Sequence, residues 1–538
     1  MSLHRIHGGL APAALPRTHV PTAIRPCPLP ARLYLPLVDD AGGALFAHVA
    51  PGRRVRRGEP LAHAADALAT VLPAPAAGLV VAIKERATAT RDARSAPHLV
   101  LEPDGSDEAV QLPPLDGQQA DPAVLRRRLA EAGVIGLGGA GFPAAQKLAA
   151  PVELLIVNGA ECEPYIGCDE ALLRAYAADV VAGTAVLARI AGASRAVIAL
   201  EDRMHEAGAA VQAALAGHPQ ITLARVPTVY PQGGERQLVE VLCAREVPAG
   251  RWPVDIGIAV QNVATAAAAW RAVAAGEAVT ARLVSVAGRG VAGAGVFEVR
   301  IGTPVSALIE AAGGYAPDAA RLVLGGPLMG VALPHDDVAL TRTSNAIVVL
   351  AGEDVRPRAP ELPCIRCGDC ADVCPVRLQP QELLRLLRDG DVDGAAGLGL
   401  ADCIECGCCA FVCPSQIPLV ESYRQGKTAH ALARAARVRA DHARERYLAR
   451  TARLAREQAE KVARVAARRE AVAQEQAAAP TPRAPAESAV PAESGAPAVA
   501  ARMDKSAVLA AIARGKARRA QQAGPAPPAG DAEQKDTP

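Results

Sequence analysis

The chain has 538 residues, a length that predicts several domains. Half of the residues are apolar, but alanine is the largest contributor and aromatic residues make up only 2%. With 58 Lys and Arg against 56 Asp and Glu, the formal net charge is +2, which excludes the strongly basic field typical of nucleic-acid-binding chains.

Residues 1–29 are expected to form an N-terminal extension. They carry charged and imidazole side chains among several prolines and lack the apolar core of a signal peptide. The chain contains no run of about 18 uninterrupted apolar residues, so the sequence predicts no membrane span. The most apolar candidate, 180–200, includes Arg189 and Arg195 and is typical of a helix followed by a strand.

Residues 30–105 are predicted to form short strands separated by tight turns. Glycines punctuate apolar and β-branched steps in two half-motifs, Val49–Leu61 and Ala74–Ile83, as in an all-β sandwich. This pattern resembles the barrel-sandwich fold of biotinyl and lipoyl carriers. A carrier needs a lysine on the hairpin between the halves, and His63–Pro73 contains none. We therefore interpret this domain as a structural or docking module.

Residues 118–275 alternate between helical and strand patterns. The segments 125–132 and 171–190 have helical periodicity, while 154–157 and 195–200 are short, apolar strands. This alternation is typical of βαβ units, which build a parallel sheet covered by helices. We expect an α/β domain of Rossmann-like type.

Residues 280–350 return to short strands with one helix between them. Strands are expected at 283–286, 295–299 and 322–324, and a helix at 304–312. The sequence predicts a small α+β domain, which we expect to be SLBB-like or β-grasp-like.

Eight cysteines in the next predicted domain, 355–425, form two copies of one pattern. Each copy has the sequence Cys-x-x-Cys-x-x-Cys-x-x-x-Cys-Pro, the spacing of a two-cluster bacterial ferredoxin. In such domains the first three cysteines of a run bind one [4Fe–4S] cluster and the fourth binds the other. We therefore expect one cluster on Cys364, Cys367, Cys370 and Cys413, and a second on Cys403, Cys406, Cys409 and Cys374.

Zinc is the alternative metal, because paired Cys-x-x-Cys motifs also bind it. Zinc sites rarely need a third cysteine at i+6 and a Cys-Pro, so the pattern favours iron–sulfur clusters. Cys408 is interpreted as a spare buried thiol. The remaining cysteines are scattered, which indicates a reducing compartment and no disulfide framework.

Residues 426–538 are expected to form a helical and disordered tail. The segment 431–470 carries 12 Lys and Arg against 5 Asp and Glu within a helical stretch, 429–479. Segments 480–502 and 523–538 are rich in Pro, Ala and Gly and are predicted to be disordered, with a second basic helix at 504–521. The basic helix is either a docking element for an acidic partner or anionic lipid, or a solvated helix.

A glycine-rich loop precedes the first strand of the α/β domain. Glycines stand at 136, 138, 139 and 141, followed by Phe142, Pro143 and, one turn later, Lys147. Glycines let backbone N–H groups approach a phosphate, and the start of a following helix adds partial positive charge. The alternative for such a loop is a tight turn without a ligand.

Four segments resemble motifs of the flavoprotein subunit of respiratory complex I, in the same order along the chain. They are the loop Gly138–Pro143, the strand end Asn158–Pro164, the segment Tyr230–Glu235 and the segment Gln261–Thr265. Two positions depart from that family, because Leu137 replaces an arginine and Ala160 an aspartate. The shared order argues against chance.

The complete domain order resembles that of the RnfC/RsxC family, a subunit family of the Rnf/Rsx electron-transport complex, over residues 1–425 and in the composition of the tail. The resemblance implies an oxidoreductase subunit with non-covalent FMN, an NAD(H) site and two [4Fe–4S] clusters. Such a subunit serves a membrane-bound, ion-translocating ferredoxin:NAD oxidoreductase. The implied partners are the other subunits and a ferredoxin-type electron donor, with peripheral association at the cytoplasmic face of the bacterial inner membrane.

The resemblance also implies roles for individual residues. The loop would surround the FMN phosphate, the asparagines and their neighbours would hold the ribityl chain and ring, and two glutamates would face the dinucleotide, with Glu163 the residue expected at the reaction. The residues expected at the FMN phosphate are Gly136, Gly138, Gly139, Gly141 and Lys147. Those expected at the ribityl chain and ring are Asn158, Glu161, Asn262 and Thr265. Glu163 and Glu235 would face the dinucleotide, and Phe142 would stack on its adenine.

Simpler interpretations exist for the same residues. Glu161 and Glu163 would then be solvated strand-end carboxylates, and Asn262 and Thr265 would cap the helix that follows them. Two other functions also fit part of the chain. One is a soluble NADH-dependent reductase of the cobalamin-reductase type, and the other is a ferredoxin-like scaffold whose α/β domain is vestigial.

Overall fold

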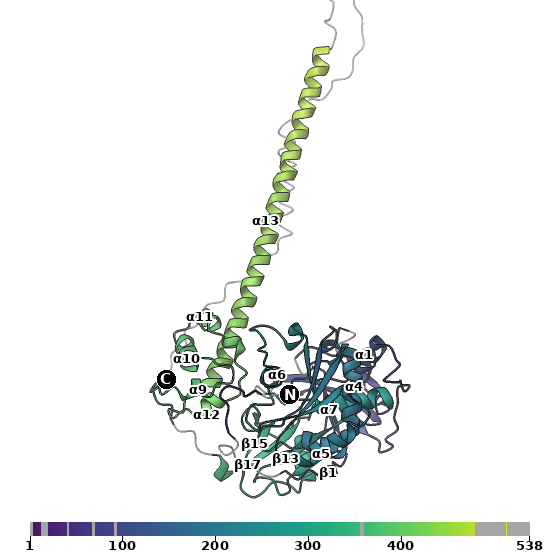
Figure 1. Ribbon diagram of the computed structural model, residues 1–538. Helices are drawn as coiled ribbons and strands as arrows, with labels where there is room; N and C mark the ends of the chain where they lie inside the picture. The colour runs from purple at the N-terminus through teal and green to yellow at the C-terminus, as the bar shows by residue number, and fades with distance from the viewer. Residues whose placement is uncertain are drawn as a thin grey trace, which may run out of the picture. The chain divides into compact units, whose positions relative to one another are not determined.

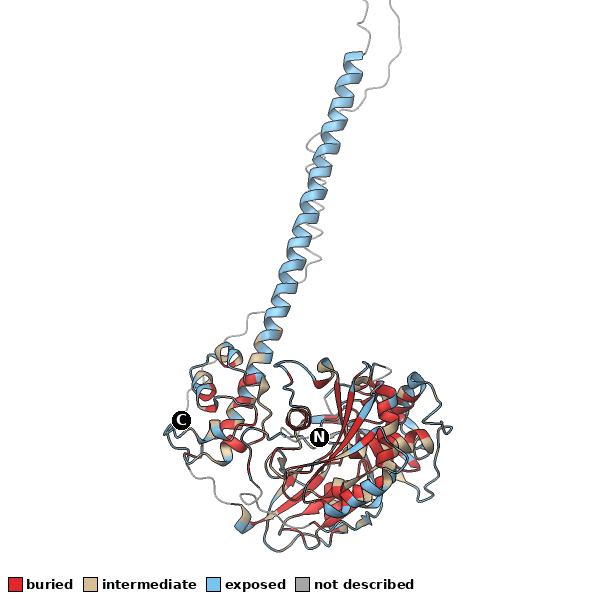
Figure 2. Cartoon of the chain, in the orientation of Figure 1, coloured by how far each residue is buried: buried red, intermediate tan, exposed pale blue. Residues whose placement is uncertain are grey.

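The computed structural model describes residues 4–11, 20–39, 42–66, 70–90, 94–355 and 360–478, together with Ala510 and Ala513. The chain divides into two compact units, Met1–Ala443 and Arg444–Pro538. All four described sheets lie in the first unit (Figure 1). Its buried residues are concentrated in these sheets and in the helices that cover them (Figure 2).

The N-terminal domain is a sandwich of two small antiparallel sheets, ordered β2-β8-β7-β4 and β3-β5-β6. Leu99 and Leu101 on β8 and Leu33 and Leu35 on β2 are fully buried between the sheets. The strands are β2 (Leu33–Pro36), β3 (Phe46–Ala47), β4 (Arg54–Val55), β5 (Pro60–His63), β6 (Val71–Pro73), β7 (Gly78–Ala87) and β8 (Ser95–Pro103).

The central domain contains an entirely parallel sheet of order β11-β10-β9-β12. The chain runs outward from β9 to β11 and then returns to place β12 on the other side of β9, which creates a topological switch point. The elements are α1 (Pro122–Glu131), α2 (Ala144–Lys147), β9 (Leu154–Gly159), α3 (Cys168–Ala175), α4 (Ala177–Ala191), β10 (Arg195–Glu201), α5 (His205–Ala214), β11 (Ile221–Val226), α6 (Glu235–Cys243), η2 (Pro253–Ile256), β12 (Ile258–Asn262) and α7 (Val263–Ala274).

Helices cover both faces of this sheet, as the continuous apolar strands require. Leu155 and Val157 of β9 pack in one core with α1, α4 and α7, while Leu154 and Ile156 pack in another with α6. The first core is continuous with that of the N-terminal sandwich. The two domains therefore share one apolar interior.

The next domain is built on a six-stranded mixed sheet of order β1-β14-β13-β17-β15-β16, covered by α8. Its first strand comes from the N-terminal extension and pairs in parallel with β14. The elements are β1 (Ile24–Pro26), β13 (Ala281–Ala287), β14 (Gly295–Arg300), α8 (Val305–Ala311), β15 (Ala319–Leu324), β16 (Val331–Leu333), β17 (Ala346–Ala351) and η3 (Gly352–Asp354).

The cysteine-rich domain repeats one backbone conformation. Gly368 (φ 92°) and Gly407 (φ 80°) take equivalent positions in the two motif copies, and so do Arg366 (φ 55°) and Glu405 (φ 59°). Each glycine precedes a one-turn helix that carries the third cysteine of its run. The elements are α9 (Asp369–Asp372), α10 (Pro380–Arg388), α11 (Val392–Gly397), η4 (Leu400–Asp402) and α12 (Cys408–Phe411).

The helix α13 (Leu419–Ala478) begins in the first unit, where Leu419, Tyr423 and Gly426 are buried, and continues into the second. Most of its later side chains are exposed (Figure 2). Among the described helices, none alone is long and apolar enough to cross a membrane; α3 and α4 meet the criteria only together, across a bend of 96°.

The expected fold class is confirmed, with some differences in the elements. The helix expected at 171–190 is two helices, because the chain bends at Tyr176, whose ring lies under the Arg271 guanidinium. The strand β1 was not expected, since three residues without an alternating pattern give no signal. The tail helix begins earlier, at Leu419. The expected disordered segments and nearly all of the second basic helix lie outside the described residues.

Candidate functional site

The carboxyl ends of β9 and β12 lie next to each other at the switch point of the central sheet. Asn158 and Asn262 are register partners on these strands. In open α/β sheets, ligands bind outside the carboxyl ends of the strands at such a point. Two of the residues that the sequence assigns to a cofactor therefore meet where the topology favours a ligand.

The glycine-rich loop is closed by its own backbone. The Gly136 amide donates to the Phe142 carbonyl at 2.8 Å, and the Gly141 amide donates to the Gly136 carbonyl at 3.0 Å. Residues 138–140 are exposed, their amides donate to no acceptor among the described residues, and Gly139 has a φ of 107°. Successive unpaired N–H groups on a glycine loop form a concavity that fits a phosphate group.

Thr265 fastens this loop to α7. Its hydroxyl, fully buried, accepts from the Leu137 amide at 2.9 Å and donates to the Ile135 carbonyl at 3.1 Å. Gly138 packs closely on Asn262, since a Cβ at Gly138 would lie 3.1 Å from the Asn262 Cβ. The loop is therefore held directly over the end of β12.

Lys147 and Glu235 are brought together beside the loop. The Lys147 Nζ lies 2.9 Å from the Glu235 Oε1, and both side chains are partly exposed. Lys147 ends α2, which is only one turn long and has no side-chain cap, so the helical contribution expected after the loop is small. Phe142 on the loop is 51% exposed, which leaves its ring open to a ligand.

The two asparagines are held by protein contacts. The Asn158 amide nitrogen donates to the Gly233 carbonyl at 2.9 Å, and its oxygen accepts from the Ala160 amide at 2.9 Å. Asn262 caps α7 by accepting from the Ala264 amide at 2.8 Å, which confirms the capping alternative for this residue. Thr265 does not cap the helix but holds the loop.

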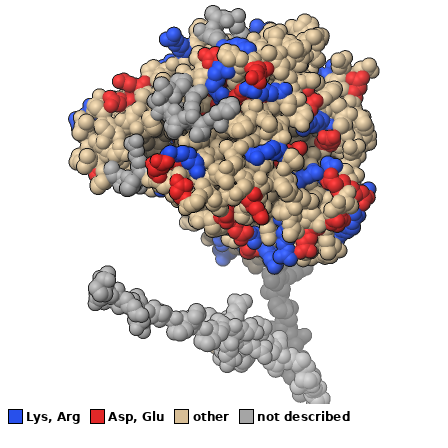
Figure 3. Space-filling model, turned by 90° about the horizontal axis from the view of Figure 1, so that it is seen from below, with Lys and Arg blue, Asp and Glu red and all other residues tan. Residues whose placement is uncertain are grey.

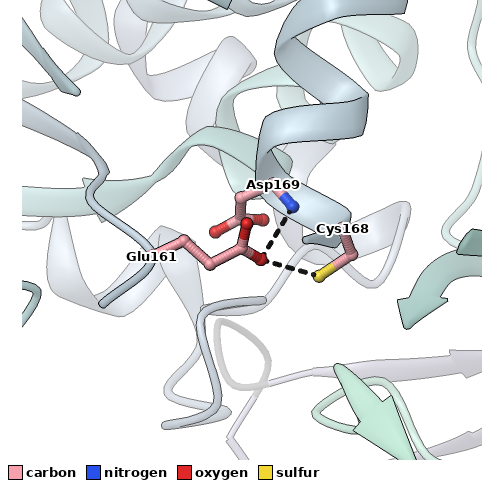
Figure 4. A group of neighbouring side chains, drawn as sticks. All are labelled: Glu161, Cys168 and Asp169. Carbon is pink, nitrogen blue, oxygen red and sulfur yellow. Dashed lines mark hydrogen bonds between the residues drawn. The ribbon is translucent and has the colours of Figure 1, made fainter. Parts of the chain in front are cut away.

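Glu161 belongs to a buried group with Cys168 and Asp169 (Figure 4). It accepts from the Asp169 amide at 3.0 Å and from the Glu170 amide at 3.3 Å, at the start of α3, and the Cys168 thiol lies 3.4 Å away. The Asn262 amide donates to Asp169 at 2.7 Å. Burial raises the pKa of Glu161 to about 8, with a further rise from Asp169. This group joins α3 to the strand ends.

Glu163 points to a loop of the following domain. Its Oε1 accepts from the amides of Leu328 and Met329 at 2.8 and 2.9 Å. Its Oε2 is buried and has no hydrogen-bond partner within the described ranges, although the Tyr230 hydroxyl is near enough to lower the Glu163 pKa. Burial is the largest effect and raises the pKa of Glu163 to about 7. A solvated strand-end carboxylate is therefore the wrong interpretation for Glu163, and equally for the buried Glu161.

One predicted set of metal ligands lines a small cavity inside the cysteine-rich domain. Cys364, Cys367 and Cys370 come from the first motif copy and Cys413 from the second, so the cavity collects the crossed set that the spacing predicts. Cys364 and Cys367 are exposed. All four donors are thiols, which suit an iron–sulfur cluster.

The other predicted set also gathers around one place. Burial raises the pKa of Cys409, with further rises from the nearby thiols of Cys406, Cys403 and Cys374 and from Cys370 of the first set. Cys408 is fully buried and interacts with Cys406, as expected of a spare thiol. A bound cluster requires thiolates, so metal binding would release these protons.

Two residues at this site have contacts that the sequence did not predict. The Tyr230 hydroxyl is buried and donates to the Cys406 carbonyl at 2.6 Å, although only the motif around Tyr230 was recognisable in the sequence. Asp169 receives the Asn262 amide. Neither contact has a local signal, because the partners lie far apart in the chain.

Basic and acidic side chains are interspersed over the face of the molecule in Figure 3. The described part of the chain has surface ion pairs, for example Arg54 with Asp104 at 2.8 Å and Arg289 with Asp354 at 2.6 Å. This agrees with the small net charge of the chain.

Models of known families match four successive regions of the chain. The RnfC barrel sandwich hybrid domain matches residues 4–106, and the Nuo51 FMN-binding domain matches residues 129–271. The SLBB domain matches residues 283–332, and the 4Fe-4S dicluster domain matches residues 363–417. These matches follow the order of the structural domains.

Among solved structures, the matches include NAD+-reducing [NiFe]-hydrogenase in the H2-reduced state. Its TM-score is 0.41 at 22% sequence identity, and the match covers 58% of this chain and 62% of that chain. The air-oxidised state of such a hydrogenase gives a TM-score of 0.40 at 22% identity, covering 51% of this chain and 54% of that chain.

Proteins named as the C subunit of the ion-translocating oxidoreductase complex are similar over most of this chain. Those of Erwinia tasmaniensis, Pseudomonas aeruginosa and Yersinia pestis are 42%, 40% and 40% identical, over 85%, 86% and 84% of the chain. The matches span 57%, 60% and 73% of these relatives, so the chain covers less than two thirds of the first two. At 40% identity over 73% of the Yersinia pestis protein, the chain belongs to the family formed by the C subunits of ion-translocating oxidoreductase complexes.

Proposed function

We propose that this chain is the electron-transfer subunit of a membrane-bound, ion-translocating ferredoxin:NAD oxidoreductase. It would exchange electrons with NAD(H) at a bound FMN and pass them singly through two [4Fe–4S] clusters. The observation that carries the proposal is the combination, within one compact unit, of two features: a glycine loop at a parallel-sheet switch point, and a cavity that collects Cys364, Cys367, Cys370 and Cys413 from the two cysteine motifs.

The loop and the strand ends fit FMN. The unpaired amides of residues 138–140 would bind its phosphate, and Lys147 would add a positive charge beside them. Gly136 and Gly141 close the loop by hydrogen bonds, while Thr265 holds it over β12. Flavin supplies the conversion between two-electron and one-electron transfer, and the protein holds and orients it.

Asn158 and Asn262 would orient the ribityl chain and ring from the strand ends. Their capping and loop contacts fix both side chains in place, which suits a preorganised cofactor site. Glu161 acts through the start of α3 and keeps this corner rigid. Its role is therefore to position the site and not to touch the cofactor.

The dinucleotide would bind over the same loop. Phe142 has an exposed ring that suits stacking on adenine, and Glu235 is positioned by its ion pair with Lys147. Glu163 lies beside the Tyr230 hydroxyl and the 325–330 loop, and its pKa of about 7 lets it hold or release a proton near neutral pH. These are the assignments that we propose for the nicotinamide side.

We place the chain at the cytoplasmic face of the bacterial inner membrane, attached to the other subunits of the complex. The family name supports a complex, and a basic stretch within α13 offers a surface for acidic partners. A ferredoxin-type donor would deliver or receive electrons, directly or through a partner subunit.

The proposal is tested by anaerobic titration of the purified chain with NADH. Bleaching of flavin absorbance, followed by reduction of an artificial one-electron acceptor, is the expected result. A chain that binds flavin but is not reduced by NADH would refute the NAD(H) assignment.

A further inference from the structure

An N-terminal segment, residues 4–11, runs between the central domain and the cysteine-rich domain. Leu10 pairs with the backbone of Tyr230, donating at 2.7 Å and accepting at 3.0 Å. One residue earlier, the Gly9 amide donates to the Val373 carbonyl at 2.9 Å. A Cβ at Gly8 would lie 2.5 Å from the Val373 carbonyl carbon, so only glycine permits this approach.

Residues outside the cysteine loops bind the backbone of one ligand set. The Tyr230 hydroxyl donates to the Cys406 carbonyl at 2.6 Å, and the His7 Nδ1 lies 3.0 Å from the Cys374 carbonyl. The Lys427 ammonium donates to the Cys403 carbonyl at 2.6 Å. Three of the four ligands expected for this cluster are thus anchored from outside, two of them by the central domain or the N-terminal segment.

A small apolar cluster surrounds the same contacts. Leu10, Tyr230, Cys406 and Cys408 are its buried members, and Leu328 packs against them. The junction therefore joins the N-terminal segment, the central domain, the 325–330 loop and the cysteine-rich domain around the 403–409 run.

The other ligand set has different surroundings. Within the described part of the chain, its cavity is lined by residues between Cys364 and Leu419, all in the cysteine-rich domain or at the start of α13. Its first two cysteines are exposed. One set thus faces the central domain, while the other faces solvent.

A hydrogen-bonded route leads from the flavin-binding strand end to the junction. The Asn158 amide donates to the Gly233 carbonyl at 2.9 Å. Tyr230 lies three residues before Gly233 in the same loop, and its hydroxyl donates to the Cys406 carbonyl. The route from β9 to a cluster ligand therefore uses two hydrogen bonds and a short stretch of backbone.

We propose that Tyr230, with the N-terminal segment, seats the Cys374–Cys403–Cys406–Cys409 set as the entry cluster that exchanges electrons with the flavin. The exposed Cys364–Cys367–Cys370–Cys413 set is then the exit toward a partner. This rests on the proposed function. NADH and one proton would reduce FMN to FMNH2, and two electrons would pass one at a time to two oxidised clusters, releasing two protons to solvent. Tyr230 is a positioning residue and is not itself oxidised.

A matched pair of variants tests the order of the clusters. Cys364→Ala and Cys403→Ala remove the first cysteine of each run, and dithionite reveals by EPR which cluster each full-length variant retains. We expect rapid-freeze EPR after mixing with NADH to show fast reduction of the retained cluster in Cys364→Ala. In Cys403→Ala the retained cluster is expected to be reduced by dithionite but only slowly by NADH. Equal NADH-driven rates, or the opposite order, would overturn the proposal.

Tyr230→Phe provides a test that keeps all cysteines. Loss of one hydrogen-bond donor beside the 403–409 run should lower the reduction potential of that cluster. At a fixed solution potential, the ratio of reduced to oxidised cluster should then fall about fivefold, which is the scale of one neutral hydrogen bond. The control is Tyr315→Phe, which removes a hydroxyl that donates to the Asp336 carboxylate at 2.8 Å in the domain of the six-stranded sheet. EPR-monitored redox titration should show the shifted potential, and rapid-freeze EPR the slower NADH reduction, only in Tyr230→Phe.

The outcomes separate this inference from the proposed function. If wild-type flavin is not bleached by NADH, the proposed function fails. If flavin is bleached and both clusters are reduced, but Tyr230→Phe matches wild type in potential and in rate, only the inference fails.

Discussion

Thr265 illustrates how a residue predicted to contact a cofactor can act one step away from it. Its hydroxyl both accepts from and donates to the backbone at the base of the glycine loop, and its side chain is fully buried. The residues expected at this site therefore fall into two groups. In the proposed site Lys147 would present a charged group to the ligand, whereas Thr265 and Glu161 bind the backbone that shapes the site.

Lys147→Ala is expected to weaken FMN binding by roughly tenfold, because it removes a positive charge beside the loop amides, and a charged hydrogen bond is worth about that much. The dissociation constant is measured by fluorescence titration of deflavinated protein. Lys84→Ala, which removes a lysine from the exposed part of β7, is the control. An unchanged dissociation constant in Lys147→Ala would remove this residue from the phosphate site.

Glu161 should make the stability of the central domain depend on pH. Burial raises its pKa from 4.5 to about 8, so the folded state binds a proton more tightly than the unfolded state. The contribution of protonated Glu161 to the free energy of unfolding is fully present below pH 4.5 and is lost as the pH rises through 8. It amounts to at most on the order of 5 kcal/mol. The thermal midpoint should therefore fall over this window, and Glu161→Gln should flatten the profile. Parallel profiles for Glu161→Gln and wild type would contradict this.

At the scale of elements, the loop between β15 and β16 is fitted to the central domain by Gly326. A Cβ at this position would lie 1.8 Å from the Glu163 Cγ. Gly326→Ala is expected to destabilise the protein by about 1–3 kcal/mol, as overpacking does, and to increase hydrogen exchange in residues 325–330. The thermal midpoint and exchange mass spectrometry measure both effects.

The control for this change is Gly397→Ala. No atom lies within 4 Å of a Cβ built at Gly397, and alanine suits the helix α11 that it ends. We expect its midpoint to equal or exceed that of wild type. A Gly326→Ala midpoint as high as that of Gly397→Ala would show that the loop does not pack as described.

Much of this architecture is readable from the sequence because the signals are local. The apolar strand β9, the helix α7 with its Asn262 cap, and the spacing of the cysteines depend on residues within one or two turns of each other. Strand β1 and the bend at Tyr176 gave no such signal, since β1 pairs with the distant β14 and Tyr176 contacts the distant Arg271.

The site was predictable in its residues but not in its contacts. Glu163 accepts a hydrogen bond from Leu328, 165 positions further on, and Tyr230 donates one to Cys406, 176 positions further on. Contacts at such separations are decided by how domains pack, which periodicity and spacing do not report. For the same reason the spacing predicted both ligand sets but not which of them faces the central domain.

At the scale of the whole molecule, the first unit combines a ligand site and a cluster domain through a buried junction. The sandwich and the central domain share one core. The N-terminal segment binds the backbone of residues 373–374 of the cysteine-rich domain, and Tyr230 of the central domain binds the backbone of Cys406. Because the junction is buried and hydrogen-bonded, the distance between the strand ends and the entry ligands is fixed by packing. Under the proposed function, the same packing would hold the flavin and the entry cluster at a constant separation.

The cofactor content of this chain decides whether a flavin and two clusters share one polypeptide. Anaerobic purification followed by iron, sulfide and flavin analysis measures that content directly. We expect about eight iron atoms, about eight sulfides and about one FMN per chain, the content of two [4Fe–4S] clusters and one flavin. A colourless preparation, or one that holds zinc in place of iron, would contradict this assignment at its base.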